Sequence, residues 1–198
     1  MTNPQQFFVN YASRLNDVLA KTDWTEIMQL AADMQACWND KRQLFICGNG
    51  GSAGNAIHLA NDFLYGIAKS AGKGLKVHAL SANPSVITCL ANDIGYDRIY
   101  ADQLSVLANA GDLLVVLSGS GNSPNIVAVL EQAKKMNVKS YAILGYTGGR
   151  CKMLADVPIH FNVDDMQISE DLQMIVGHML MQWLYACHTN ANNTNKDE

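Results

Sequence analysis

The chain has 198 residues, 48% of them hydrophobic and 16% charged, with a formal net charge of −4 at pH 7, which suits one compact domain with a full core. Lysine and arginine are scattered without a basic stripe or interleaved aromatic residues, so we expect no nucleic-acid partner. The N-terminus lacks a signal-peptide pattern, polar residues interrupt the longest apolar stretch, and the five cysteines form no Cys-x-x-Cys pair, so we expect a cytoplasmic protein without membrane association.

Two helices are predicted at the N-terminus, over 4–20 and 24–38, because apolar residues recur there at helical spacing. The first of them has little sheet left to cover. We expect it to pack against other subunits in a helical bundle, and packing on its own domain is nearly as favourable. Residues 1–40 are therefore interpreted as an N-terminal helical segment that packs on the domain and in the oligomer.

Strand-like apolar runs alternate with helical ones in the next part of the chain. The runs cover 44–47, 76–80, 113–117, 140–144 and 157–161. This alternation predicts an α/β fold with a five-stranded, parallel, doubly wound sheet, and we assign it to a domain over 41–188. The remaining residues, 189–198, are polar and are expected to form a disordered tail.

A serine- and glycine-rich turn over 117–124 joins the third apolar run to a helix. It lies at the carboxyl end of a strand, where open α/β sheets bind ligands, and the helix would direct its unpaired N–H groups at the turn. The hydroxyls of Ser118, Ser120 and Ser123 converge there. No lysine is present and the spacing is not a dinucleotide fingerprint, so no nucleotide cofactor is expected. A cradle for a sugar phosphate is favoured over an ordinary turn with capping serines.

A second loop of the same kind, Gly-Asn-Gly-Gly-Ser over 48–52, follows the first apolar run. In a doubly wound sheet, two glycine-rich strand ends that flank the switch in strand order face one crevice. Backbone amides from both loops could then close around one ligand. The pair of loops makes a binding site more plausible than either loop does alone.

Polar residues in two otherwise apolar helices point to chemistry. His58 and Asp62 are four residues apart on one helix face. Glu170 and His178 are eight apart, about 80° around the last helix, so both can face one cleft. Together they offer N and O donors suited to Zn²⁺. Taken singly, each has a simpler explanation: a core imidazole for His178, a surface or capping role for His58, a solvated carboxylate for Asp62 and a helix-dipole preference for Glu170.

These motifs resemble the sugar isomerase (SIS) domain, most closely its phosphoheptose isomerase family, over roughly residues 5–188. The likeness rests on residues 48–58, the pair Asn92 and Asp93, the loop 118–123, Gly148 with Gly149, and the histidine in the last helix. It implies a flavodoxin-like three-layer sandwich and a homotetramer with sites at subunit interfaces. It also implies an aldose–ketose isomerase that interconverts sedoheptulose 7-phosphate and D-glycero-D-manno-heptose 7-phosphate for lipopolysaccharide or other surface polysaccharide.

The resemblance also implies roles for individual residues. Asp62 would be the base that moves a proton between C1 and C2 through a cis-enediol, and His178 would move protons at the substrate oxygens. The predicted ligands of one Zn²⁺ per subunit are His58, Asp62, Glu170 and His178. The predicted substrate contacts are Asn49, Gly50, Gly51, Ser52, Asp62, Asn92, Asp93, Ser118, Gly119, Ser120, Ser123 and Glu170.

Three positions depart from the family pattern: Asp62 replaces a glutamate, Glu170 a glutamine and Gly119 a threonine. A carboxylate shortened by one methylene is withdrawn from its substrate, which affects proton abstraction. Two alternatives therefore stay open. One is an isomerase of another ketose phosphate. The other is a non-catalytic phosphosugar-binding protein, acting as a regulator or as a tetrameric scaffold like the DnaA-interacting replication-initiation protein.

Overall fold

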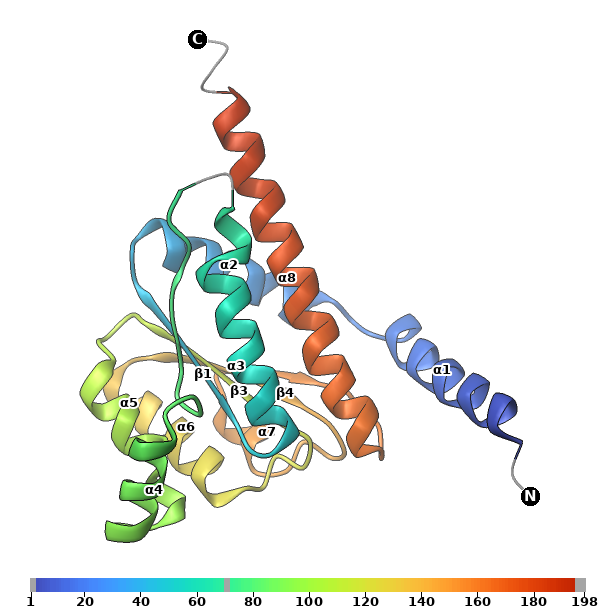
Figure 1. The fold of residues 1–198 in the computed structure, drawn as a ribbon, viewed down its shortest axis with the longest axis horizontal. Coiled ribbons are helices and arrows are strands. Elements are labelled where there is room, and N and C mark those ends of the chain that lie inside the picture. The colour runs from blue at the N-terminus through green and yellow to red at the C-terminus, as the bar shows by residue number, and fades with distance from the viewer. Residues whose placement is uncertain (1–2, 70–71, 195–198) are drawn as a thin grey trace.

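A five-stranded parallel sheet forms the centre of the structure, a computed structural model that describes residues 3–69 and 72–194 (Figure 1). The strand order is β2-β1-β3-β4-β5. Each predicted strand is confirmed to within one residue at either end. The strands are β1 (Gln43–Gly48), β2 (Lys76–Ala79), β3 (Leu113–Ser118), β4 (Lys139–Leu144) and β5 (Val157–His160).

Helices cover both faces of this sheet and create two hydrophobic cores. One core is closed by α2 (Thr25–Asn39), α3 (Gly51–Leu64) and α8 (Met166–Thr194), and the other by α5 (Ala101–Leu107), α6 (Pro124–Met136) and α7 (Cys151–Leu154). Successive residues of a strand point to opposite faces, so Val115 enters the first core while Leu114 and Val116 enter the second. The central strand is therefore apolar throughout, as expected of a three-layer α/β sandwich.

The shorter elements lie around the ends of the sheet. A 3-10 turn η1 (Gly66–Ala68) follows α3, while α4 (Pro84–Asp93) and the 3-10 turn η2 (Tyr96–Arg98) precede α5. Among the described residues, no helix is both long and apolar enough to cross a membrane.

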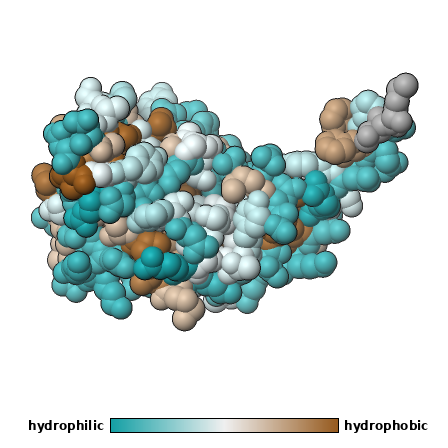
Figure 2. Space-filling model, turned by 90° about the horizontal axis from the view of Figure 1, so that it is seen from below, coloured by the Kyte–Doolittle hydropathy of each residue, from teal (hydrophilic) through white to brown (hydrophobic). Residues whose placement is uncertain are grey.

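Helix α1 (Pro4–Ala20) extends from the rest of the molecule as an arm (Figure 2). None of its residues is buried, and its first turns leave Phe7, Phe8 and Val9 exposed. Two contacts tie its middle to the start of α8: the Tyr11 hydroxyl donates to Asp171, and Arg14 forms an ion pair with Asp165 at 2.7 Å. The helix thus joins the domain along one side and offers apolar side chains to solvent at its N-terminal end.

The last helix is longer than the sequence predicts. Helix α8 continues to Thr194, into the segment 189–198 that is expected to be a disordered tail, and residues 195–198 lie outside the described part of the chain. The His188 ring packs edge-on against Trp38 with 3.6 Å between ring centroids, and the Thr189 hydroxyl donates to the Tyr185 carbonyl at 3.0 Å. Extending an existing helix needs no new nucleus, so a polar segment that follows can continue it.

Candidate functional site

The two glycine-rich loops emerge side by side from neighbouring strands. Gly48, the last residue of β1, is paired in register with Leu117 of β3, and the loops that follow therefore leave the same edge of the sheet. Asn49 in the first loop and Asn125 at the start of α6 join them, since each side-chain amide donates to the other at 2.8 Å. The two predicted loops are thus held together by direct contact.

Internal hydrogen bonds shape the serine-rich loop. Ser118 is only 6% exposed, and its hydroxyl oxygen accepts from the Gly121 N–H at 3.0 Å. The Ser120 hydroxyl accepts from the Asn122 N–H at 3.3 Å, while the Ser123 side chain forms no cap bond to α6. Ser120 and Ser123 are partly exposed beside the N-terminus of a 13-residue helix, where an anion is favoured.

The segment that follows β4, residues 145–151, is hydrogen-bonded to the serine-rich loop. The Cys151 N–H donates to the Gly121 carbonyl at 2.9 Å, and the Arg150 N–H donates to Asn122 Oδ1 at 3.0 Å. Gly121 has φ of 65°, and a side-chain carbon there would overlap the Gly148 carbonyl. Only glycine meets both conditions, so this contact between the two loops requires glycine at position 121.

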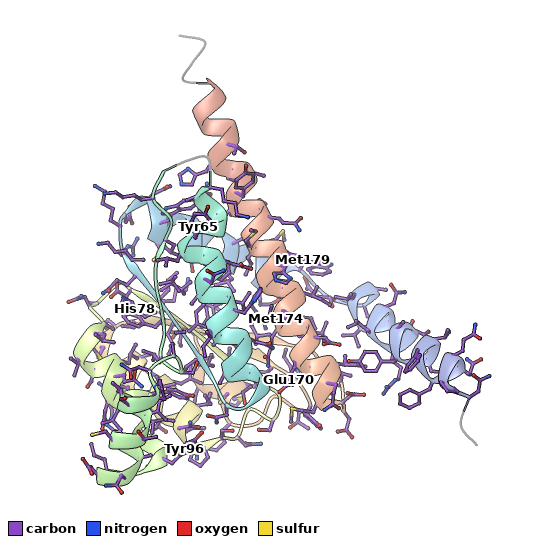
Figure 3. All side chains as sticks on the ribbon, viewed as in Figure 1. Tyr65, His78, Tyr96, Glu170, Met174 and Met179 are labelled. Carbon is purple, nitrogen blue, oxygen red and sulfur yellow. The ribbon has the colours of Figure 1, made fainter. Side chains whose placement is uncertain are left out.

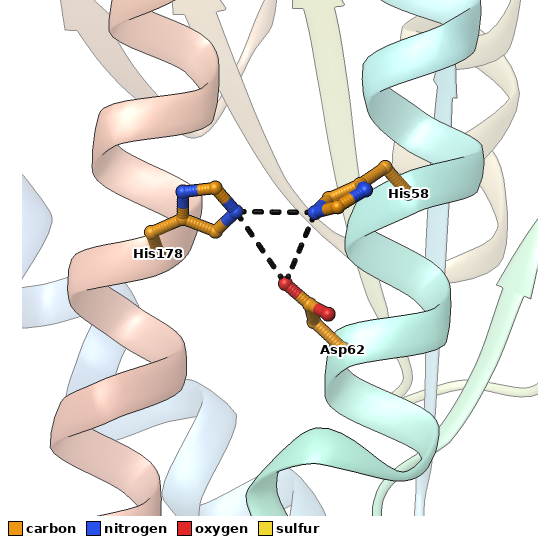
Figure 4. A group of neighbouring side chains, drawn as sticks. All are labelled: His58, Asp62 and His178. Atoms are coloured by element: carbon orange, nitrogen blue, oxygen red, sulfur yellow. Dashed lines mark hydrogen bonds and ion pairs between the residues drawn. The ribbon is translucent and has the colours of Figure 1, made fainter.

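Three ionisable side chains meet where α3 and α8 cross, as Figure 4 shows. His58 and Asp62 come from α3 and His178 from α8. The two imidazole Nε2 atoms are 3.1 Å apart, and Asp62 Oδ2 lies 3.3 Å from His58 Nε2 and 3.5 Å from His178 Nε2. The imidazoles are about half exposed, at 51% and 48%, whereas Asp62 is 16% exposed. The group is therefore open to a ligand on the surface of a single chain.

Two further contacts set the approach of these helices. Leu59 lies directly against Gly177, the residue before His178, where any side chain would overlap it. Nearer the start of α3, Asn55 Nδ2 donates to the Glu170 carbonyl and to Gln173 Oε1, both at 3.0 Å. Gln173 Nε2 is buried and has no partner among the described residues.

Glu170 lies apart from the other three predicted metal ligands. Its carboxylate rests against Gly51, the first residue of α3, so that a side chain at Gly51 would overlap it. Figure 3 places Glu170 near the beginning of α8, beside the start of α3. The structure therefore brings three of the four predicted ligands together and places the fourth at the loop end of the same pair of helices.

The remaining predicted substrate contacts lie in the two loops and at the end of α4. Gly50 and Gly51 are exposed and Ser52 is buried at the start of α3, whereas Gly119 is buried in the serine-rich loop. Asn92 and Asp93 are exposed at the end of α4, where Asn92 Nδ2 donates to Asp93 Oδ1 at 2.8 Å.

Sequence reasoning missed Asn125 and Tyr96. The Tyr96 hydroxyl donates to Asn49 Oδ1 at 3.2 Å. The one sequence signal for Asn125 is its position directly after the serine-rich loop over 117–124.

Comparisons with known proteins agree with this architecture. A family model described as SIS domain matches residues 6–145. A phosphoheptose isomerase of Helicobacter pylori is 36% identical over 150 residues, which are 76% of this chain and 78% of the relative. One of Chlorobium phaeobacteroides is 33% identical over 196 residues, 95% of this chain and 85% of the relative. The structure of a phosphoheptose isomerase from Francisella tularensis superimposes with a TM-score of 0.84 at 24% identity, covering 92% of this chain and 98% of that one.

Proposed function

This chain belongs to the SIS domain family, among its phosphoheptose isomerases, and we propose that it interconverts sedoheptulose 7-phosphate and D-glycero-D-manno-heptose 7-phosphate. One observation carries the proposal. A loop suited to phosphate lies beside the start of α3, and the same helix carries His58 and Asp62 farther along, opposite His178. From Gly51 to His58 the helix rises about 10 Å, which separates a phosphate anchor from acid–base groups along one elongated substrate.

The reaction is a 1,2 proton shift between ketose and aldose through a cis-enediol. It needs a base at carbon, a proton donor and acceptor at oxygen, and an anchor for the phosphate. Asp62 is the base that carries the proton between C1 and C2, and His178 moves protons at the carbonyl and hydroxyl oxygens. The two side chains are 3.5 Å apart, so both can reach neighbouring atoms of one substrate.

Phosphate binding positions the sugar for this step. Ser120, Ser123 and the N-terminus of α6 hold the phosphate, while Ser118 shapes the loop around it. Asn49 and the following glycines contact the sugar. Ser52 and Glu170 lie beside these glycines, at the starts of α3 and α8. Asn92 and Asp93 contact the sugar from the end of α4. Binding energy from the non-reacting phosphate then maintains the alignment of the open-chain sugar.

The donor set of His58, Asp62 and His178 fits Zn²⁺. Two imidazole nitrogens and one carboxylate oxygen are typical zinc donors, and bonds of about 2.0–2.1 Å in a tetrahedron place donors about 3.3 Å apart. The observed separations are 3.1, 3.3 and 3.5 Å. Bound zinc would occupy His178 Nε2 and would supply a Lewis acid for the carbonyl and the enediolate oxygen. The proton transfers assigned to that nitrogen are those of the metal-free site. Glu170, the fourth predicted ligand, lies at the loop end of α3 and α8 and is not one of these three donors.

The proposal includes a homotetramer with sites at subunit interfaces, in the cytoplasm. Three observations support it: the exposed apolar end of α1, the half-exposed His58 and His178, and an apolar groove of about 410 Å³ between α2 and α8. The groove contains Trp24 and Trp183. All five cysteines are free thiols, which suits a reducing compartment.

A direct assay tests the function. Purified protein is given sedoheptulose 7-phosphate with added zinc and, separately, with a chelator. We expect turnover that Asp62→Asn and His178→Ala abolish and that Asp164→Asn, an exposed control, leaves unchanged. Binding without turnover in either condition would overturn the heptose assignment and leave the two alternatives, another ketose phosphate or a non-catalytic phosphosugar-binding protein. Full activity in Asp62→Asn would overturn the assigned base.

A further inference from the structure

Two asparagine side chains form a reciprocal pair of hydrogen bonds across the site. Asn49 Nδ2 donates to Asn125 Oδ1, and Asn125 Nδ2 donates to Asn49 Oδ1, both at 2.8 Å. Asn125 is 1% exposed, in the first turn of α6, whereas Asn49 is partly exposed in the loop after β1. Rotating either amide alone by half a turn would place N–H against N–H and oxygen against oxygen. The pair therefore fixes both amide planes.

Two tyrosines also contact the first loop, one from η2 and one from the residue just before α5. The Tyr96 hydroxyl donates to Asn49 Oδ1 at 3.2 Å, so this oxygen accepts two hydrogen bonds. The buried Tyr100 hydroxyl donates to the carbonyl of Gly48, the residue before Asn49. The backbone and the side chain of the first loop are thus each held by a group outside it.

The Asn49 side chain has one hydrogen-bond donor left for a ligand. Its Oδ1 is occupied by Asn125 and Tyr96, and one of the two Nδ2 hydrogens is used by Asn125. One N–H is left, on the side of the amide away from Asn125. An Asn49 amide that was free to rotate would instead present nitrogen or oxygen with comparable ease.

We propose that Asn125 and Tyr96 are positioning residues that hold the Asn49 amide as a hydrogen-bond donor to an oxygen of the sugar phosphate, an inference that rests on the proposed function. Asn49 lies at the loop end of α3, and the group of His58, Asp62 and His178 lies farther along that helix. The hydrogen bond is therefore made to a non-reacting part of the substrate, equally in the ground and transition states. Its loss raises KM and changes kcat little.

A double-mutant cycle separates positioning from general stability. We expect Asn125→Leu to raise KM for sedoheptulose 7-phosphate about tenfold and Tyr96→Phe about threefold, with kcat within about twofold of wild type. In an Asn49→Ala background, neither change should raise KM further, because both act through Asn49. Val129→Ala, a buried control in α6, should lower the melting temperature and leave KM unchanged.

The outcomes distinguish this inference from the proposed function. Effects on KM that add in the Asn49→Ala background, or unchanged KM in both single variants, would overturn the positioning role even if the enzyme is active. If the protein binds sedoheptulose 7-phosphate without converting it, the isomerase proposal fails, and the same cycle is read from dissociation constants by calorimetry. Neither binding nor turnover in the wild type would overturn both. Should Asn125→Leu not fold, Tyr96→Phe decides, because Tyr96 is 55% exposed.

Discussion

Leu59 on α3 lies against the backbone of Gly177 on α8 so closely that a single additional carbon at Gly177 would overlap the end of the Leu59 side chain. The two residues are the immediate neighbours of His58 and His178 in sequence. Their contact therefore sets how closely the two histidines approach. The separation of 3.1 Å between the imidazole nitrogens depends on glycine at this position.

Gly177→Ala should accordingly move His178 on α8 away from His58 and Asp62 on α3. We expect zinc affinity and kcat/KM each to fall at least about tenfold, with about 1–3 kcal/mol lost in stability through overpacking. Adding Leu59→Ala removes the overlapping atoms and should recover much of the zinc affinity, although stability falls further because a cavity is created. Zinc calorimetry on the two single variants and the double variant checks this. Unchanged zinc affinity in Gly177→Ala would show that the helix contact does not control the site.

The glycine at position 119 is explained by Met166. A side-chain carbon at Gly119 would lie 2.6 Å from the Met166 sulfur, which covers the serine-rich loop from the start of α8. We expect Gly119→Thr, the residue common in the family, to raise KM about fivefold, a modest effect because the thioether is flexible. Met166→Ala should relieve the increase. An equal KM for Gly119→Thr with and without Met166→Ala would contradict the compensation.

Gly121 provides a sharper test of the phosphate loop. Its φ of 65° and the adjacent Gly148 carbonyl both exclude a side chain. Gly121→Ala should cost at least about 1–2 kcal/mol from the left-handed backbone alone and weaken substrate binding. Gly54→Ala is the matched control, because a side chain there meets no atom within 4 Å and the position is helical. Melting temperatures and KM values for the two variants should diverge; similar values would argue against a pre-formed loop.

Asp165 should make stability depend on pH in acid. Its carboxylate accepts from the Ile168 N–H at 3.1 Å and pairs with Arg14, and the pKa of Asp165 is held below its ordinary 3.8, chiefly by the Ile168 hydrogen bond. Because the folded pKa is lowered, this stabilisation is present above pH 3.8 and is lost as the pH falls through the folded value. Asp165→Ala should cost about 1 kcal/mol near neutral pH and progressively less in acid.

Urea unfolding of Asp165→Ala at several pH values measures this difference. Asp164→Ala removes an exposed neighbouring carboxylate and serves as the control. A difference between wild type and Asp165→Ala that stays constant down to pH 3 would rule out the ionised Asp165 carboxylate as the source of this stabilisation.

The sheet could be predicted because each strand is marked by the residues of that strand alone. Continuous apolar runs such as 113–117 are bounded by glycine-rich turns, and that pattern has few other solutions in an α/β chain. The two loops could be located for the same reason, since each follows a run directly. The reciprocal contact of Asn49 and Asn125 could not be predicted, because the residues are 76 positions apart and no periodicity links them.

The position of Glu170 shows where helical periodicity stops being informative. The spacing of Glu170 and His178 places both on one side of α8, but eight residues also separate them by about 12 Å along the helix axis. A shared face is therefore not a shared site. Where α3 crosses α8 decides which of the two joins His58 and Asp62, and that crossing depends on Leu59 and Gly177. The tertiary contact between His188 and Trp38, near the end of α8, has no signal in the sequence either.

Proton exchange with solvent during turnover tests the central claim most directly. Sedoheptulose 7-phosphate is incubated with the protein in D₂O, and the heptose phosphates are analysed by NMR and mass spectrometry. An enediol route through Asp62 predicts the aldose product with deuterium at C2, and no conversion or label with Asp62→Asn. Recovery of unlabelled sedoheptulose 7-phosphate from the wild-type reaction, with no aldose formed, would contradict the isomerase assignment.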